Sequence, residues 1–554
     1  MIPKKDEVLF TALGGAGEIG MNMYAYGHAG AWLAVDCGVS FGDPNLPGID
    51  VFTADPSFLD EEETNLAGLI ITHAHEDHIG GVAHLWPFLR CPVYVTPFAA
   101  EILKGKLRET DFSNDVPVHV LQAGSGKAQI GPFSIELINM SHSIPEPQSV
   151  LIKTKIGNLL HTGDWKIDRA PQIGQPIDEE KLRSLGVEGL LAVVGDSTNA
   201  MEAGYSPSEA IAKKGLAEVI TRQPGRVAIG CFATNVARVQ SIGEAAKTTG
   251  RSLVLAGRSL HRVTAAAKQA GYLQGLPEIV PEENMRDLPA DKVLMIVTGS
   301  QGEGRAALSR IASDTHPSVF LEQGDTVIFS SRVIPGNETE VGEIQNKLTK
   351  RGIQVISESD VDETVHVTGH PMQGELSELL NWTRPKFLIP VHGEWRHMAA
   401  HASLGREHQV EDAVVGGNGA VIRINSSSAQ IIDRVYSGKL ALDGERLIDP
   451  QGPVLPQRRR LARAGVVSVA VAINAKGRIA GQVTAESYGC LDREVDGDVL
   501  NAVKLEVEER LECLDTRQTK DNGLVEKAIV AAAKRVFGLE TGKKPMVLAH
   551  IIRL

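Results

Sequence analysis

Cysteine is scarce in this sequence. The 554 residues include only five cysteines, which are widely scattered and form no C-x-x-C pair. An odd number without close spacing excludes a small secreted fold held together by disulfides. Cysteine serves here as a small apolar residue, so we expect a protein of a reducing compartment.

Long apolar runs and an excess of basic charge are also missing. No apolar stretch approaches the ~20 residues of a membrane span, and residues 1–6 lead straight into a strand-like run without a signal peptide. We therefore expect a cytoplasmic protein with no membrane contact. The formal net charge of −13 argues against a protein that coats nucleic acid non-specifically, although a local basic cleft or bound cations would still attract phosphate groups.

The remaining composition is typical of a large globular chain. Hydrophobic residues make up 42% and charged residues 23% of the sequence. A chain of 554 residues is too long for one core, so we expect roughly two to four domains. Strand and helix patterns alternate along the chain, which predicts an α/β architecture.

Candidate metal ligands gather after one predicted strand. Residues 69–72 form a short apolar run, and four ligand side chains follow it directly: His73, His75, Asp77 and His78. Imidazole nitrogens and carboxylate oxygens at this close spacing are what a metal site requires. A lone histidine such as His84 is more often an ordinary surface or core residue.

Three later strand-like runs end in the same residue types, at His142, Asp164 and His392. An α/β sheet builds its site at strand ends, so we expect these residues to complete a two-metal site. Asp36 also follows a strand. It is either a turn residue or a partner that fixes the tautomer of a histidine ligand.

A glycine pattern near the start imitates a nucleotide-binding motif. Gly15, Gly17 and Gly20 match G-x-G-x-x-G. The dinucleotide fingerprint needs a helix after the glycines, whereas residues 21–36 are predicted as strand, turn and strand. We therefore do not expect NAD binding, and the glycines let the chain turn close to the site.

More than 200 residues separate Asp164 from His392, which is too many for a loop. Strand-like runs such as 252–256 and 293–298 alternate there with helical patterns such as 208–221 and 236–247. The segment is therefore predicted to be an inserted parallel α/β domain.

The last part of the sequence follows residues 449–453, which are rich in chain breakers. A basic cluster comes next, and it is either a solvated linker face or a nucleic-acid contact: Arg458, Arg459, Arg460 and Arg463. Beyond it we predict a hairpin of strands 465–473 and 478–484, two helices at 499–513 and 524–537, and a final strand at 545–552.

The ordered set of ligand residues resembles the metallo-β-lactamase superfamily. Residues 195–199, 366–370 and 390–394 are similar to motifs A, B and C of its β-CASP nucleases, and residues 299–303 and 330–338 resemble the bacterial ribonuclease J family. The resemblance implies an αββα metallo-β-lactamase sandwich with an inserted β-CASP α/β domain and a small C-terminal α/β domain. The implied boundaries are 1–205 and 363–450 for the sandwich, 206–362 for the insertion, 451–464 for a linker and 465–554 for the last domain.

The resemblance also implies the ligands of two divalent cations, zinc or manganese. One cation would be held by His73, His75 and His142, the other by Asp77, His78 and His392, with Asp164 between them. His370, oriented by Asp196, and Asp77 would be catalytic. Residues implied to contact the substrate phosphates are Thr234, Asn235, Ser300, His366, Val367, Thr368, Gly369 and His370.

The implied activity is metal-dependent cleavage of single-stranded RNA in RNA maturation and decay. The enzyme would degrade RNA exonucleolytically in the 5′→3′ direction, with a preference for 5′-monophosphate ends, and would also cleave it endonucleolytically. It would form a homodimer or tetramer through the C-terminal domain. The family more often has serine near position 234 and a larger residue than Ala237, although Thr234 keeps a hydroxyl group.

Three rival functions remain open on this fold. A thioester or lactam hydrolase does not need so large an insertion. A di-iron redox protein typically has glutamate where this chain has His75, and a non-catalytic RNA-binding scaffold would have lost ligands that are all present here.

Overall fold

Two compact units make up the part of the chain that the structure describes. The computed structural model describes residues 1–41, 46–61, 64–334, 336–492 and 494–554. The first unit comprises residues 1–40 and 53–439, and the second comprises residues 41–52 and 440–554. Pro335, within the 330–338 stretch that carries part of the resemblance, lies outside the described residues.

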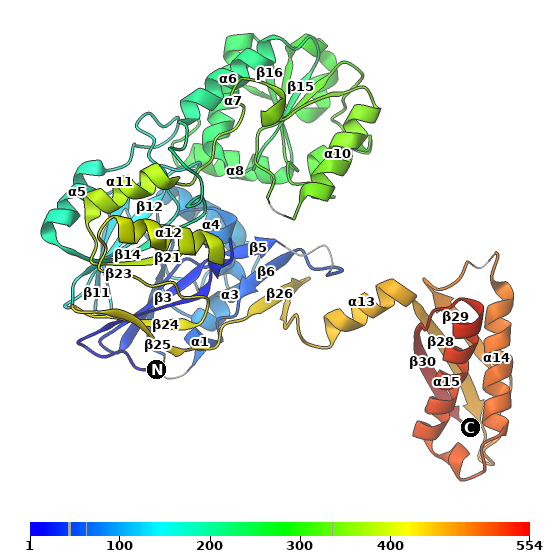
Figure 1. The fold of residues 1–554 in the computed structure, drawn as a ribbon. Coiled ribbons are helices and arrows are strands. Elements are labelled where there is room, and N and C mark those ends of the chain that lie inside the picture. Colours follow the sequence, from blue (N-terminus) through cyan, green and yellow to red (C-terminus); the bar gives the residue numbers. More distant parts are fainter. Residues whose placement is uncertain (42–45, 62–63, 335, 493) are drawn as a thin grey trace. The chain divides into compact units, whose positions relative to one another are not determined.

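Two mixed sheets form the base of the first unit (Figure 1). The first sheet has eight strands in the order β25 (Ala429–Arg434), β24 (Ala420–Ile424), β1 (Val8–Gly14), β3 (Met23–His28), β4 (Ala31–Val35), β7 (Leu66–Ile70), β8 (Val93–Val95) and β9 (Val118–Val120). The second has seven, in the order β10 (Lys127–Ile130), β11 (Phe133–Asn139), β12 (Gln148–Lys153), β13 (Asn158–His161), β14 (Leu190–Asp196), β21 (Phe387–Val391) and β23 (Asp412–Ala413).

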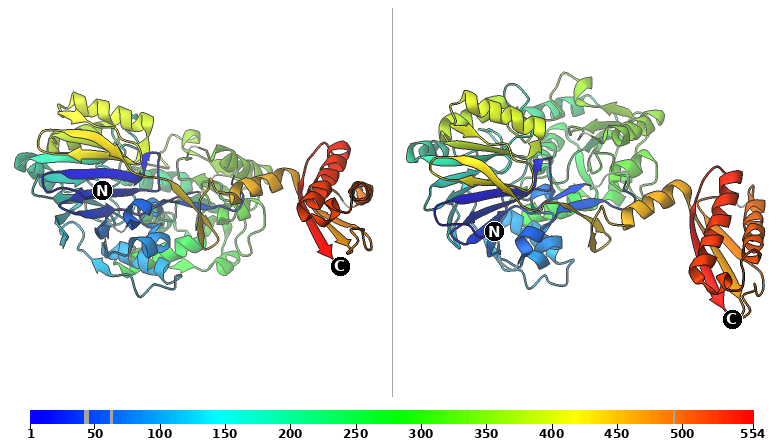
Figure 2. Two further views of the ribbon diagram at one scale, coloured as in Figure 1. Left: turned by 90° about the horizontal axis from the view of Figure 1, so that it is seen from below. Right: turned by 60° about the horizontal axis from the view of Figure 1, so that its bottom comes forward.

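Alternating side chains build the layers of this base. Val150 and Ile152 of β12 lie in the core between the two sheets, whereas Leu151 lies in a second core that also contains Leu182 and Leu376. The helices on that outer side are α5 (Glu179–Glu188), α11 (Gln373–Thr383) and α12 (Trp395–Glu407). On the opposite side lie α1 (Ser57–Asp60), α3 (Val82–Leu89) and α4 (Pro97–Leu107), so helices flank a pair of sheets as predicted (Figure 2).

Parallel pairing brings several strand ends to the same edge. β14 pairs in parallel with β13 on one side and β21 on the other. Asp164, Asp196 and His392 therefore lie at neighbouring strand ends. In the other sheet β4 and β7 are also parallel, which places Asp36 beside the turn that begins at Thr72.

The inserted domain is a parallel α/β sheet, as the sequence predicts (Figure 1). Its six strands follow the order β17 (Ile279–Val280), β16 (Ser252–Ala256), β18 (Val293–Val297), β15 (Val227–Gly230), β19 (Thr326–Phe329) and β20 (Gln354–Ile356). The helices between them are α6 (Glu209–Thr221), α7 (Val236–Thr249), α8 (Arg258–Gln269), α9 (Ala307–Ala312) and α10 (Glu338–Lys350).

The second unit ends in a three-stranded sheet, β29-β28-β30, packed against two helices (Figure 2). Its elements are β26 (Lys439–Asp443), β27 (Arg446–Ile448), α13 (Val454–Ala464), β28 (Val466–Ile473), β29 (Thr484–Tyr488), α14 (Gly497–Glu512), α15 (Asn522–Glu540) and β30 (Met546–Arg553).

The arginine cluster lies on helix α13, in which only Leu455 is buried. One expectation for this unit needs correction. The second hairpin strand begins at Thr484 and not at residue 478, because the chain turns at Gly477 and Gly481, which have φ values of 77° and 95°. Among the described residues, no helix combines the length and apolar character needed to cross a membrane.

Candidate metal centre

The turn after β7 carries the first four ligand residues. The short helix α2 (Glu76–Ile79) begins just after His75 and is held from outside by backbone bonds, in which Asn22 donates to Asp77 and Cys37 donates to His78. Gly38 packs so closely here that a Cβ atom would overlap the carbonyl of Asp77. The local chain path therefore depends on contacts with the residues just before β3 and just after β4 as well as on the turn itself.

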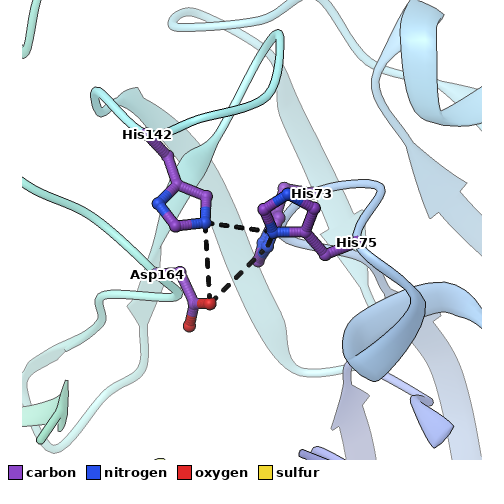
Figure 3. Close-up of side chains that lie close together, drawn as sticks. All are labelled: His73, His75, His142 and Asp164. Carbon is purple, nitrogen blue, oxygen red and sulfur yellow. Dashed lines mark hydrogen bonds and ion pairs between the residues drawn. The ribbon is translucent and has the colours of Figure 1, made fainter. Parts of the chain in front are cut away.

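Three histidines and one aspartate converge in a first ligand group (Figure 3). His75 Nδ1 lies 3.0 Å from His73 Nε2 and 3.0 Å from His142 Nε2. Asp164 Oδ2 lies 3.8 Å from both His73 Nε2 and His142 Nε2. All four side chains point toward one another, His73 and His75 from one turn and His142 and Asp164 from two other loops.

A second ligand group shares Asp164 with the first. His78 Nε2 lies 3.2 Å from Asp164 Oδ2 and 3.5 Å from Asp77 Oδ2. His392 Nε2 lies 3.2 Å from Asp77 Oδ2 and 3.6 Å from Asp164 Oδ1. A third group of possible ligands overlaps with the second and contains Asp164, Asp196, His370 and His392. The division of the seven candidate ligands between two cations therefore stays a prediction.

The spacing of these donor atoms fits a metal ion. Two ligands on one tetrahedral zinc lie about 3.3 Å apart, and the observed separations run from 3.0 to 3.8 Å. Asp164 Oδ1 is buried and has no hydrogen-bond partner among the described residues. A buried carboxylate oxygen without a hydrogen bond is costly, and a cation between the two groups would satisfy it.

Protonation states also suit metal binding in the first group. Burial lowers the pKa of His73 and His142 well below the ordinary value, and lowers the pKa of His75 to about 4. These imidazoles are therefore neutral at neutral pH and have lone pairs for a cation. Burial opposes ionisation of Asp164, but the charges of His392 and His78 hold its pKa well below the usual range.

Asp36 fixes the orientation of His78. Its Oδ2 accepts a hydrogen bond from His78 Nδ1 at 2.7 Å, which leaves Nε2 directed at the ligand group. Oδ1 accepts from the backbone N–H of Thr72 at 2.8 Å. Asp36 has a positive φ of 63°, a conformation that aspartate and asparagine tolerate better than most residues. Of the two readings that the sequence leaves open for Asp36, the contacts favour the tautomer-fixing one.

Asp196 holds two histidines at once. Its Oδ2 accepts from His370 Nδ1 at 2.8 Å, and its Oδ1 accepts from the Thr198 hydroxyl at 2.7 Å. That hydroxyl lies 2.7 Å from His392 Nδ1 and accepts its proton, so His392 Nε2 faces the ligand group. Burial opposes protonation of His370, but the charges of Asp196 and Asp164 raise its pKa.

The loop of residues 366–370 also contacts this centre. The carbonyl of Gly369 accepts from His142 Nδ1 at 2.5 Å. Asn199 donates to the Thr368 hydroxyl at 2.9 Å, and Lys166 donates to the Thr368 carbonyl at 3.2 Å. These bonds hold the loop against the first ligand group.

The other predicted substrate contacts lie in different environments. Asn235 caps α7 by accepting from the backbone N–H of Arg238, and Thr234 precedes it in the same turn. His366 lies 3.4 Å from Arg238, and burial together with this charge lowers its pKa to about 3. Ser300 and Val367 are buried.

Two residues near the ligands were not given a role from the sequence. Asn22 Nδ2 lies 3.0 Å from His78 Nε2 and donates to the backbone carbonyl of Asp77 at 2.9 Å. The hydroxyl of Thr198 links Asp196 to His392. Thr198 lies inside a quoted motif, but Asn22 follows the misleading glycine pattern and carries no sequence signal of its own.

Family models match most of the chain. Residues 17–169 match the metallo-beta-lactamase superfamily, residues 224–348 the ribonuclease J beta-CASP domain, residues 359–415 the Zn-dependent metallo-hydrolase RNA specificity domain, and residues 453–554 the ribonuclease J C-terminal domain. A solved protein of unknown function from Enterococcus faecalis shares the fold at 15% identity, with a TM-score of 0.52 over 76% of this chain and 100% of its own. Fold and site together define a metal-dependent hydrolase of the metallo-β-lactamase superfamily with an inserted β-CASP domain.

Full-length relatives narrow this class. The chain is 40% identical to ribonuclease J of Sinorhizobium meliloti over 99% of its own length and 98% of the relative's, and 36% identical to ribonuclease J of Mycolicibacterium smegmatis over 98% and 97%. It is also 34% identical to ribonuclease J 1 of Streptococcus pyogenes over 99% and 98%. The chain belongs to the ribonuclease J family, so it is a metal-dependent ribonuclease that binds RNA and divalent metal, and the three rival functions are set aside.

Proposed function

We propose that the enzyme holds two divalent cations and degrades single-stranded RNA from its 5′-monophosphate end, with additional internal cleavage. The observation that carries this proposal is the pair of ligand groups that share Asp164. When bound, such a pair of cations supplies an activated water and positive charge for an in-line phosphoryl displacement.

The chain's own residues position and complete this chemistry. His370 is held through Nδ1 by Asp196, so its Nε2 is the ring nitrogen available to donate a proton to the leaving 3′ oxygen. Its side chain keeps 22% exposure, which lets substrate reach it. Burial opposes ionisation of Asp77 and Asp196, but neighbouring histidines hold the pKa of both carboxyl groups below the usual range. The carboxylates contact His392 and His370 respectively.

The substrate's phosphates are assigned to the loop of residues 366–370 and to the start of α7. Ala237 N donates to the carbonyl of Ser143 at 3.1 Å, which brings the start of this helix next to His142. The first backbone N–H groups of α7 already have acceptors, namely Thr234, Ser143 and Asn235, so the phosphate contact is assigned to the side chains of this turn. Thr234, Asn235 and Ser300 complete the assignment as in the family pattern.

Zinc is the first choice of metal and manganese the second. Imidazole-rich groups suit zinc, and one matched family model is described as a Zn-dependent metallo-hydrolase domain. We assign the domains as 1–205, 206–362, 363–450 and 465–554, joined by residues 451–464. A ribonuclease of this kind would act in RNA maturation and decay in the cytoplasm.

Self-association is assigned to the C-terminal sheet. β28 and β30 pair so that Ser468, Ala470 and Ala472 lie beside Leu548, His550 and Ile552 on one face. The helices α14 and α15 pack on the opposite face, and Leu548 and Ile552 are exposed. An exposed apolar sheet face is a suitable surface for a dimer or tetramer.

The proposal is tested on metal-loaded protein with two RNAs that differ only in a 5′-monophosphate or 5′-triphosphate. We expect faster release of mononucleotides from the monophosphate. Asp164→Asn should abolish cleavage, whereas His370→Asn should slow it with metal content unchanged. His84→Asn serves as the matched control, since His84 lies outside both ligand groups. Equal cleavage of both RNAs, or loss of metal from His370→Asn, would contradict the assignment.

A further inference from the structure

Trp395 is a large exposed aromatic at the beginning of α12. Its side chain is 56% exposed, whereas Trp32 and Trp165 are fully buried. An exposed indole is a frequent recognition element because it offers a large rigid apolar surface.

The indole lies across a floor of two glycines. A Cβ atom at Gly17 would come within 2.9 Å of the indole Nε1, and one at Gly417 within 2.6 Å of Cζ2. These contacts cover both the five-membered and the six-membered ring. Any larger residue at either position would displace the indole from its place.

Hydrogen bonds hold this floor in position. Ala16 N donates to Asn418 Oδ1 at 2.9 Å, and Asn418 Nδ2 donates to Glu18 at 2.6 Å. The short strands β2 (Ala16–Gly17) and β22 (Gly393–Glu394) pair in parallel directly before Trp395. The indole is therefore presented on a rigid surface and not on a free loop.

Two short chain segments connect the indole with the metal centre. Trp395 follows His392 by three residues, so their Cα atoms are no more than roughly 11 Å apart. Gly17 likewise precedes Gly20 by three residues, and a Cβ atom at Gly20 would lie 3.7 Å from Asp77 Cβ. A nucleotide close to the scissile phosphate is within reach of the indole.

Two cations on the segments that flank Trp395 are paired with carboxylates. Arg396 pairs with Glu394 at 2.8 Å, and Lys439 pairs with Glu18 at 2.5 Å. Their charges are therefore partly neutralised. Recognition at this place depends on the flat ring and not on net positive charge.

We propose that Trp395 is a stacking platform for one base of the single-stranded RNA whose scissile phosphate lies at the metal centre. This inference rests on the proposed function. A flat ring suits a nucleobase, since every base has a stacking face, and the platform favours no particular sequence. Loss of one such stack lowers binding by about 5- to 150-fold.

The test uses the full-length, metal-loaded enzyme and 5′-monophosphorylated RNAs in which one nucleotide at a time lacks its base. With the unsubstituted enzyme, one abasic position should lower kcat/KM by about 5- to 150-fold. Trp395→Ala should lower kcat/KM on intact RNA to a similar extent, mainly through KM. The kcat/KM of this variant should then be the same on intact RNA and on RNA that is abasic at that position. Trp395→Phe should retain most of the activity and the sensitivity, because phenylalanine keeps a stacking face.

Tyr488→Ala is the matched control, because Tyr488 is 62% exposed and lies in strand β29 of the C-terminal sheet. The inference is overturned if, at every abasic position, the loss of kcat/KM for Trp395→Ala acting on abasic RNA equals the product of the two single losses. Independent losses of this kind mean that the two groups share no contact. It is also overturned if Trp395→Ala behaves like the control. An unsubstituted enzyme that cleaves no RNA would instead refute the proposed function.

Discussion

Replacing Asp36 by asparagine tests whether a residue outside the ligand groups controls metal affinity. The carboxylate accepts hydrogen bonds from His78 Nδ1 at 2.7 Å, from the Thr72 N–H at 2.8 Å and from the Thr72 hydroxyl at 2.9 Å; the hydroxyl can rotate, whereas the first two donors are fixed. Asparagine offers only one oxygen, so one of the two fixed donors must face an NH2 group. The substitution suits the site because asparagine, like aspartate, tolerates the positive φ of 63°.

The magnitude follows from the unmet donor. A buried donor without a partner costs about 1–3 kcal/mol, and loss of the group that fixes a histidine ligand typically lowers metal affinity about 10- to 100-fold. Because His78 belongs to the second ligand group, we expect one of the two cations to be weakened more than the other.

A competition titration against a fluorescent zinc chelator measures this effect. Asp325→Asn is the matched control, since Asp325 is a buried carboxylate of the inserted domain that accepts from the backbone N–H groups of Arg226 and Glu322. The control should lose stability and keep its metal affinity. An Asp36→Asn protein that binds both cations within about twofold of the parent would refute the reasoning.

Three further predictions concern the glycine at the ligand loop, a buried histidine and the metal itself. Gly369→Ala should reduce bound metal, because the new Cβ would lie 2.6 Å from His142 Cε1, and metal analysis should show no loss in Gly105→Ala, which meets no neighbour within 4 Å. Burial lowers the pKa of His401 from 6.5 to about 4, so the unfolded chain takes up a proton that the folded chain does not. Stability should therefore fall as pH falls through that window, by up to about 1.4 kcal/mol per pH unit, and urea titrations of His401→Asn should show a smaller loss. Removal of metal by a chelator should lower the melting temperature, and returned zinc should raise it with rising concentration, since the cation binds only the folded state; a melting temperature independent of zinc would count against a resident metal.

Most of the architecture was predictable because it follows from local patterns. The parallel sheet of the insertion was recognisable from alternating strands and helices, and the glycine pattern at 15–20 was distinguished from a nucleotide site by the strands that follow it. Helix α13 was not predicted, because its arginines give no apolar stripe and only Leu455 is buried. The second hairpin strand was misplaced, because glycines at 477 and 481 interrupt an otherwise strand-like run.

The candidate ligands were predictable to different degrees. The cluster from His73 to His78 is local, and its spacing alone indicates a metal site. The contact of Thr198 with His392 joins residues 194 positions apart, and that of Asn22 with Asp77 joins residues 55 positions apart. No local pattern encodes such distant pairs.

The sequence by itself determined the kinds of ligand, their order along the chain and the family to which the chain belongs. Only the tertiary structure decided between the two readings of Asp36 and showed that Thr198 directs the imidazole of His392. The physical reason is the parallel register of β13, β14 and β21, which brings distant strand ends within hydrogen-bond reach of one another.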